Sequence, residues 1–185
     1  KDGVVNGAQI IMDDITEKKE LERRLYEMSI TDPLTNTYNF RYFTQKLEEE
    51  IWRAQRYGER FSLIVFDIDR FKNYNDSFGH QVGDLILKAT VDMVKGRIRR
   101  TDTLARWGGE EFIILLPNTG PKEAAKLAEE LRQKLIQLKV WNNESVTASF
   151  GVAEYQEGDT PESIVKRADA MMYRAKNDGR NRVRY

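Results

Sequence analysis

The sequence from Arg106 to Phe112 reads Arg-Trp-Gly-Gly-Glu-Glu-Phe, so two glycines and two adjacent carboxylates lie between two apolar runs. Residues 103–107 and 112–116 have the composition of strands, and we expect the glycines to form the turn of a β-hairpin. Glycine permits positive φ and lets a ligand approach the backbone, while neighbouring carboxylates offer hard oxygen ligands. Taken alone, the stretch also fits a tight turn with solvated acids.

The composition predicts one globular domain with a short additional element. The chain has 185 residues, 40% of them hydrophobic, and it has no cysteine, which excludes disulfides and thiolate metal sites. No run of about 18 apolar residues is present, so we expect no membrane contact within this chain and a cytoplasmic location. A membrane anchor further upstream is left open.

Charge is balanced over the whole chain but not locally. Thirty basic and thirty acidic residues cancel, which argues against binding nucleic acid through a basic surface. Basic residues gather at 95–106 and again at 176–184. These clusters suit a small anionic ligand better than a long polyanion, and a solvated face is the alternative.

The first thirty residues predict two elements ahead of the main domain. Residues 3–13 alternate loosely and contain Ile-Ile-Met at 10–12, so we expect one strand left from an upstream domain. A helix capped by Thr16 follows, and its narrow apolar face consists of Leu21, Leu25 and Met28. This face predicts either packing on the main domain or a short parallel coiled coil, and about two heptads do not decide between them.

Helices and strands alternate through the rest of the chain. We expect helices at 39–57, at 121–138, from Thr160 to Gly179, and along Leu87 to Ile98, with a polar connection at 71–84 and strands at 61–68, 103–107, 112–116, 146–155 and 182–185. The nearly continuous apolar run at 61–68 predicts a central strand buried on both faces. The pattern predicts an α/β (α+β sandwich) fold, in which helices flank a mixed, largely antiparallel sheet of five strands.

Acidic residues lie where the predicted central strand ends. Asp67 and Asp69 are two residues apart and emerge at the border between buried structure and a loop. Asp67 and Glu110 could bind a divalent cation together, provided that the hairpin lies beside the central strand. A triphosphate held there would have Lys72, Lys176 and Arg180 as counter-charges, which indicates phosphoryl or nucleotidyl transfer.

Several separated motifs then identify a resemblance over residues 31–185. In order, they are Asp32-x-Leu34-Thr35 with Asn39, Asp67-x-Asp69-x-Phe71-Lys72-x-x-Asn75-Asp76, Gly79-His80-x-x-Gly83-Asp84, Gly108-Gly109-Glu110-Glu111-Phe112, Ser149-x-Gly151-Val152, and Ala168-Asp169-x-x-x-Tyr173-x-Ala175-Lys176-x-x-Gly179-Arg180-Asn181. This ordered set resembles the GGDEF family of diguanylate cyclases, in its GGEEF spelling.

The resemblance implies a palm-like sheet and an enzyme, a nucleotidyltransferase that joins two GTP molecules into cyclic di-GMP with release of two pyrophosphates. By position, Asp67, Glu110 and the backbone carbonyl of Ile68 would hold Mg²⁺ or Mn²⁺. Glu111 would assist metal binding or remove the proton of the attacking 3′-hydroxyl. The two nucleotides must face each other, so one GTP per chain implies a two-fold homodimer.

The same resemblance assigns the substrate contacts. Asn75 and Asp84 would hydrogen-bond the guanine edge, where a carboxylate accepts from the N1 and N2 donors that adenine lacks. The phosphates would be held by the backbone of Arg70 and Phe71 together with the side chains of Lys72, Lys176 and Arg180. Asp69 is then expected to be a structural acid, since Asp67 already fills the metal role.

A second site is implied by Arg99-x-x-Asp102, which precedes the signature glycines. Its placement resembles the product-inhibition motif of the family, in which this arginine and aspartate bind cyclic di-GMP. The alternative to an active cyclase is a catalytically weak module that acts as a receptor for cyclic di-GMP or GTP.

A separate resemblance concerns the leading residues: the predicted strand, the sequence Asp14-Ile15-Thr16-Glu17 and the charged helix after it resemble the exit of a PAS sensor domain. Residues 1–15 would then be the remnant of a PAS-like sensor domain, 16–30 a signalling helix and 31–185 the cyclase domain. Residues 36–38 and Phe40 depart from the usual family pattern, which affects the local shape of the turn that follows the helix.

Overall fold

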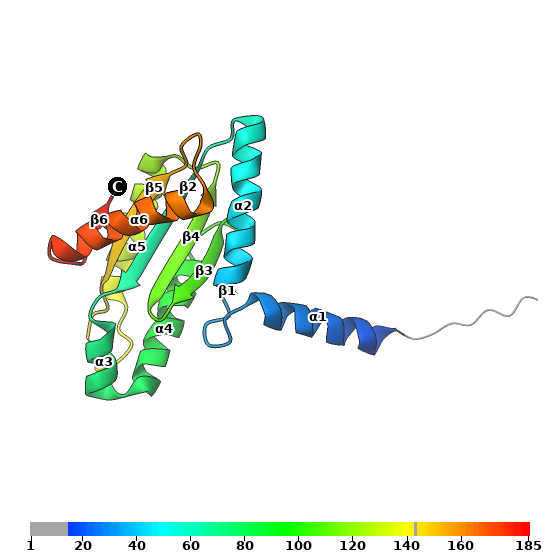
Figure 1. Cartoon of the computed structure of the whole chain (residues 1–185). Coiled ribbons are helices and arrows are strands. Elements are labelled where there is room, and N and C mark those ends of the chain that lie inside the picture. The colour runs from blue at the N-terminus through cyan, green and yellow to red at the C-terminus, as the bar shows by residue number, and fades with distance from the viewer. Residues whose placement is uncertain (1–14, 143) are drawn as a thin grey trace, which may run out of the picture.

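The computed structural model describes residues 15–142 and 144–185. The strand predicted at 3–13, and all of the predicted sensor-domain remnant except Ile15, lie outside the described residues. In the described part, one sheet forms the centre and helices cover both of its faces (Figure 1). The strands are β1 (Tyr38–Asn39), β2 (Phe61–Ile68), β3 (Thr103–Gly108), β4 (Glu111–Pro117), β5 (Ala148–Glu154) and β6 (Val183–Arg184).

The strand order is β1-β3-β4-β2-β5-β6, which places β2 near the middle as predicted. Strand β2 is buried along its whole length and pairs antiparallel with β4 and β5. The prediction of five strands is wrong by one, because β1 also joins the sheet, parallel to β3. Two residues are too few to produce an alternating pattern, so β1 has no signal in the sequence. The other edge strand, β6, pairs parallel with β5.

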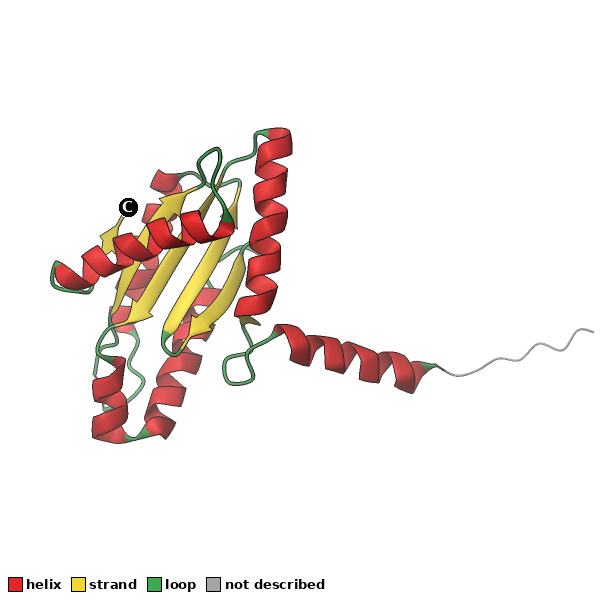
Figure 2. Ribbon diagram, viewed as in Figure 1, coloured by secondary structure: helices red, strands yellow, loops and turns green. Residues whose placement is uncertain are grey.

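Helices pack on the two faces of the sheet in pairs (Figure 2). The helices are α1 (Thr16–Ile30), α2 (Phe40–Tyr57), α3 (Phe71–Phe78), α4 (His80–Lys95), α5 (Pro121–Gln137) and α6 (Pro161–Asn177). Side chains of α2 and α6 share one hydrophobic core with Val65 of β2, while those of α4 and α5 share the other with Phe66. Successive residues of β2 thus point into opposite cores, as strand geometry requires.

Capping residues explain where two of the predicted helices begin. The Asn39 side chain accepts the backbone N–H of Tyr42 at the start of α2. Thr160 forms a capping box with Ser163, and Pro161 occupies the first turn of α6. The prediction that Thr16 caps α1 is wrong, because Thr16 is the first helical residue and Ile15 holds the cap position.

The connection predicted at 71–84 is largely helical. Helix α3 occupies Phe71–Phe78 and α4 begins at His80, so only Gly79 separates them. Phe71, Tyr74 and Phe78 all contribute to the core formed with α4. Their spacing of three and four residues is the helical signal that the polar composition concealed. Helix α4 ends at Lys95, which leaves Ile98 beyond it.

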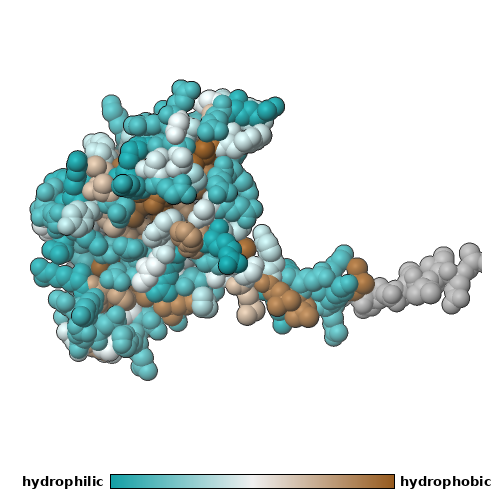
Figure 3. Space-filling view, viewed as in Figure 1, coloured by the Kyte–Doolittle hydropathy of each residue, from teal (hydrophilic) through white to brown (hydrophobic). Residues whose placement is uncertain are grey.

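Helix α1 projects from the domain, and none of its residues is buried (Figure 1). Leu21, Leu25 and Met28 are 59%, 57% and 75% exposed, and hydrophobic surface is visible along this helix (Figure 3). The first alternative for this helix, packing on the main domain, is therefore wrong. The coiled coil stays a prediction. Among the described residues, no helix combines the length and the apolar character needed to span a bilayer.

Gly151 of β5 is a site of close backbone approach rather than a bulge. A Cβ atom at this position would lie 2.1 Å from the carbonyl oxygen of Ala168 and 2.2 Å from the backbone nitrogen of Met172. Helix α6 thus packs directly on the backbone of β5, which fixes the position of the later turns of α6 relative to the end of β2.

Candidate active site

The end of β2 and the turn between β3 and β4 lie side by side. Asp67 is in register with Glu111 across the antiparallel pair, and the Ile68 N–H donates to the Glu110 carbonyl oxygen at 3.3 Å. Gly109 has a φ of +44°, the left-handed region for which the sequence of the turn provides glycine. The hairpin therefore lies beside the central strand, as the prediction of a shared cation site at Asp67 and Glu110 requires.

Asp67 is a buried carboxylate with one cationic partner. It is 6% exposed, and the Lys176 Nζ of α6 lies 2.8 Å from its Oδ2. Burial raises the pKa of Asp67 from its ordinary value of 3.8 to about 6, although Lys176 opposes the rise. The nearby charges of Glu110 and Glu111 raise this pKa further.

Glu111 belongs to the same acidic cluster. Burial is the main cause of its raised pKa, Lys176 opposes this effect, and Asp169 and Glu110 add repulsion. Asp169 lies two turns of α6 before Lys176. The sequence reasoning gave it no role, although it stands within a quoted motif. Lys176 acts on Asp67 and on Glu111, and the further acids Glu110 and Asp169 leave an excess of negative charge, an arrangement that favours binding of a further cation.

The acidic cluster fits a divalent cation that is only partly enclosed by side chains. Among the described residues, no three His, Asp or Glu side chains group closely enough to hold a metal ion by themselves. Mg²⁺ commonly takes one or two carboxylates and completes its coordination with water and substrate phosphates. Asp67 and Glu110, with a backbone carbonyl such as that of Ile68, are a donor set of this kind.

Asp69 is separate from the acidic cluster, because β2 ends at Ile68 and the chain turns there. Its carboxylate accepts the hydroxyls of Ser149 and Thr147 at 2.7 and 2.8 Å, and the backbone N–H of Asn181 at 3.0 Å. The expectation of a structural role for Asp69 agrees with these contacts.

The hairpin of α3 and α4 brings together the two residues expected to contact guanine. A Cβ at Gly83 would lie 2.0 Å from the Asn75 Oδ1, so the Asn75 side chain rests directly on the backbone of α4. Asp84 is the next residue of α4 and is exposed. Asp84 is thus exposed and Asn75 half-buried, and both lie in the pair of helices that follows β2.

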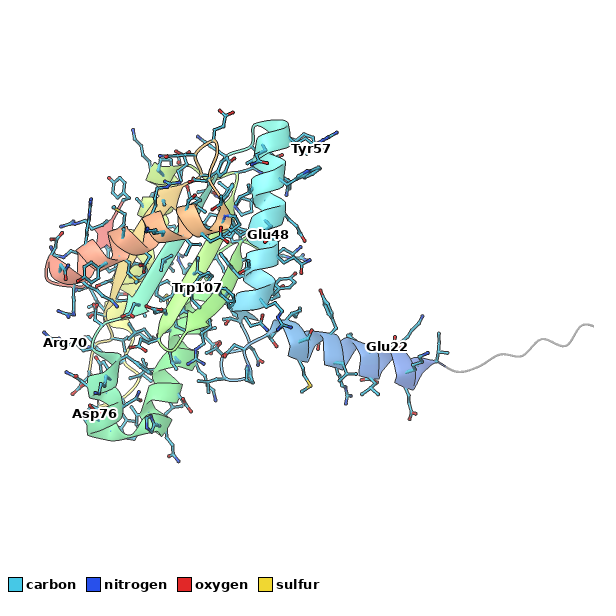
Figure 4. The ribbon with its side chains drawn as sticks, in the orientation of Figure 1. Glu22, Glu48, Tyr57, Arg70, Asp76 and Trp107 are labelled. Carbon is cyan, nitrogen blue, oxygen red and sulfur yellow. The ribbon has the colours of Figure 1, made fainter. Side chains whose placement is uncertain are left out.

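Basic residues surround the turn between β2 and α3. Arg70 precedes α3 with a left-handed φ of 56° and lies at the junction of strand and helix (Figure 4). Arg70 and Arg180 both line a cavity of about 440 Å³. Lys72 is exposed in the first turn of α3, and Lys176 contacts Asp67. The structure thus brings most of the predicted phosphate ligands to one end of the sheet.

Arg99 and Asp102 lie at the opposite end of β3 from the signature turn. The Arg99 N–H donates to the Asp102 Oδ2 at 2.7 Å, and both residues line a cavity of about 310 Å³ that also includes Arg97 and Lys126. Burial raises the pKa of Asp102, while the Arg99 backbone and charge oppose this. The cavity is distinct from the acidic cluster, and its lining combines three basic residues with three acids, Asp102, Glu123 and Glu130.

The turn after α1 is tied directly to the signature turn. Arg106 donates from Nη1 to both carboxylate oxygens of Asp32 at 3.2 Å, and from Nε to the Gly109 carbonyl at 2.8 Å. Thr35 donates to Asp32 from its backbone and its hydroxyl. These contacts hold the pKa of Asp32 below its ordinary value despite partial burial.

Comparison with known proteins identifies relatives over most of the chain. The sequence profile of the family "Diguanylate cyclase, GGDEF domain" matches residues 29–182. Diguanylate cyclase DgcM of Escherichia coli K12 is 39% identical over 173 residues, which cover 94% of this chain and 42% of that protein. The chain thus spans less than half the length of this relative.

Solved structures agree with the sequence comparison. The coiled coil and GGDEF domain of DgcB from Caulobacter crescentus, in complex with c-di-GMP, superposes with a TM-score of 0.87 and 31% identity, covering 92% of each chain. The active GGEEF domain of a diguanylate cyclase from Vibrio cholerae gives a TM-score of 0.76 and 36% identity, covering 79% of this chain and 95% of that one.

Proposed function

The chain belongs to the GGDEF family of diguanylate cyclases, and from this premise we propose that it joins two GTP molecules into cyclic di-GMP, releasing two pyrophosphates. The observation that carries the proposal is the cluster of Asp67, Glu110 and Glu111 at the end of the central strand, because these acids come from two segments that only the fold brings together. A partly buried acidic cluster next to Lys176 suits a metal-bound triphosphate.

Asp67, Glu110 and the Ile68 carbonyl are the proposed ligands of Mg²⁺ or Mn²⁺. When bound, the cation neutralises phosphate charge and polarises the α-phosphorus for attack. Glu111 adds a carboxylate whose pKa is raised by burial, so it is suited to accept the proton of the 3′-hydroxyl that attacks. Lys72, Lys176 and Arg180, with the backbone at 70–71, balance the charge of the triphosphate.

Asn75 and Asp84 select guanine in this proposal. The Asp84 carboxylate accepts from N1–H and from the exocyclic N2 amino group of guanine, two donors that adenine lacks, and Asn75 supplies a matching amide. Each 3′-oxygen must reach the α-phosphorus of the other nucleotide, so two chains with one GTP each form the active dimer. The exposed face of α1 supports a coiled coil as the dimer contact, with residues 1–15 as the end of a preceding sensor domain.

Gly83→Ala tests the guanine contact. Alanine favours a helix, yet its Cβ would lie 2.0 Å from the Asn75 Oδ1 and displace that side chain, while the Phe71 Cζ at 3.1 Å would have to move only by a few tenths of an ångström. We expect affinity for a nonhydrolysable GTP analogue to fall about tenfold, with little change in melting temperature. Gly96→Ala is the matched control, because its Cβ would meet only carbonyl oxygens at 3.6 Å. Unchanged affinity in Gly83→Ala would argue against Asn75 as a base contact.

The enzyme and the receptor alternatives differ in turnover. Incubation of the purified chain with GTP and Mg²⁺, followed by chromatography of the nucleotides, is expected to give cyclic di-GMP and pyrophosphate. Unreacted GTP at high protein concentration, together with tight cyclic di-GMP binding, would favour the receptor instead.

Product inhibition through Arg99 and Asp102 is the second part of the proposal. The planar guanidinium can donate to phosphate or to a guanine edge, and Asp102 can accept from guanine nitrogens. Arg99→Ala is therefore expected to raise the inhibition constant for cyclic di-GMP at least about tenfold while the initial rate stays within about twofold. Arg100→Ala, an exposed neighbour, is the control. An unchanged inhibition constant in Arg99→Ala would refute product inhibition at this site.

A further inference from the structure

The loop after α6 holds three consecutive residues with left-handed backbone. Gly179, Arg180 and Asn181 have φ values of 113°, 64° and 46°. Each non-glycine residue in this region costs on the order of 1 kcal/mol, so the conformation at Arg180 and Asn181 requires fixed partners. Because Arg180 extends from this loop, the loop conformation decides where its guanidinium lies.

The buried Asp69 carboxylate is one of these partners. Its Oδ2 accepts the Asn181 N–H at 3.0 Å and the Thr147 hydroxyl at 2.8 Å, and its Oδ1 accepts the Ser149 hydroxyl at 2.7 Å. Asp69 is 4% exposed. All three neighbours donate, so each of these contacts uses the Asp69 carboxylate as an acceptor.

We propose that Asp69 is a positioning residue for the phosphate end of the nucleotide. By accepting the Asn181 N–H, it fixes the loop in the conformation that directs Arg180 toward the phosphates. The inference rests on the proposed function, and it gives Asp67 and Asp69 different tasks although they are two residues apart. Asp67 faces Lys176, whereas Asp69 faces β5 and the loop after α6.

The other contacts of the loop support this assignment. The Arg132 Nη1 of α5 donates to the Asn181 Oδ1 at 2.9 Å, and the Arg180 N–H donates to the Ala175 carbonyl at 3.0 Å. Asn181 is thus held by its backbone and by its side chain. Asp69 and Arg180 line the same cavity as Arg70. Figure 4 labels Arg70 at the point where β2 meets α3.

Three substitutions separate the possible roles of Asp69. Asp69→Ala removes the acceptor of the Asn181 N–H. Asp69→Asn keeps it, because the amide oxygen can accept from Asn181 and Thr147 while the Ser149 hydroxyl can turn to accept from the amide nitrogen. Ser149→Ala removes one hydrogen bond of the same carboxylate but leaves the bond to Asn181.

A double-mutant cycle with Arg180→Asn tests the proposal, since asparagine tolerates left-handed backbone and carries no charge. Affinity for a nonhydrolysable GTP analogue is expected to fall about tenfold in Asp69→Ala and in Arg180→Asn, and to fall no further in the double variant. Asp69→Asn and Ser149→Ala should stay within about threefold of the unaltered chain. Losses that multiply in the double variant, or normal affinity in Asp69→Ala, would overturn the proposal.

Binding separates this inference from the proposed function, because it requires no turnover. A chain that binds the analogue but makes no cyclic di-GMP would refute the proposed cyclase activity. The double-mutant cycle would then still test the role of Asp69, because it measures binding alone. Absence of binding by the unaltered chain would overturn both. If Asp69→Ala does not fold, the rate of hydrogen exchange at the Asn181 backbone N–H in the unaltered chain tests whether Asp69 holds this loop. Protection is expected, and exchange at the rate of an open loop would overturn the proposal.

Discussion

Replacing Glu110 by alanine is expected to lower the rate of cyclic di-GMP formation at least about 1,000-fold, which corresponds to roughly 4 kcal/mol of transition-state stabilisation. Glu110 stands in the signature turn, where its carbonyl accepts the Ile68 N–H and its charge acts on Asp67. In the proposed mechanism its carboxylate is one of two that hold the metal. The backbone contact does not depend on the side chain, so the fold should persist.

Turnover at saturating GTP and Mg²⁺, with the melting temperature measured in parallel, checks this prediction. Glu48→Ala is the matched control, because Glu48 is an exposed glutamate on α2. It should keep the rate and the melting temperature of the unaltered chain. Retention of more than about a tenth of the activity in Glu110→Ala would remove this carboxylate from the metal site.

Asp67→Asn is expected to stabilise the metal-free chain while it abolishes turnover. A rise in the pKa of Asp67 from 3.8 to about 6 means that the folded state binds this proton more tightly than the unfolded state. The free energy of unfolding therefore falls as pH rises from about 4 to about 6, by about 3 kcal/mol, and remains lower above pH 6. Asparagine removes the buried charge, so the variant should gain about 2 to 3 kcal/mol at pH 7 and little at pH 4.

Urea unfolding in the presence of EDTA, at pH 4 and pH 7, measures this difference. Lys176 loses its partner in the variant, but it is 27% exposed and can reach water. Asp76→Asn, an exposed aspartate of α3, should leave the free energy of unfolding unchanged at both pH values. If the free energy of unfolding of Asp67→Asn at pH 7 is equal to or lower than that of the unaltered chain, the buried Asp67 carboxylate does not destabilise the fold, and the prediction is wrong.

The parts of the fold that the sequence predicts are those with a continuous local pattern. The buried strand β2, the start of α2 next to Asn39 and the Thr160-Pro161 start of α6 lie where expected. Helix α3 was missed because its three aromatic residues are diluted by polar neighbours, and β1 because two residues carry no period. Pairing with a distant strand, rather than local preference, creates β1.

In the candidate site, too, the sequence could not predict the features that depend on contacts between distant residues. That Asp67 and the signature turn meet was a condition that spacing alone could not decide, since it depends on the pairing of β2 with β4. The tie between Asp69 and Asn181 joins residues 112 positions apart. No local pattern encodes such a contact, so the sequence could indicate only that Asp69 is a structural acid and not what it holds. Asp169 was missed for the same reason.

The rate of cyclic di-GMP formation as a function of protein concentration tests the central claim most directly. In the proposed mechanism two chains, each with one GTP, meet for the reaction, so the specific rate should rise with concentration until the dimer is saturated. A Glu110→Ala chain added in excess should lower the rate, because it forms mixed dimers. A specific rate that is independent of protein concentration and unaffected by the added variant, or no cyclic di-GMP at any concentration, would contradict the account.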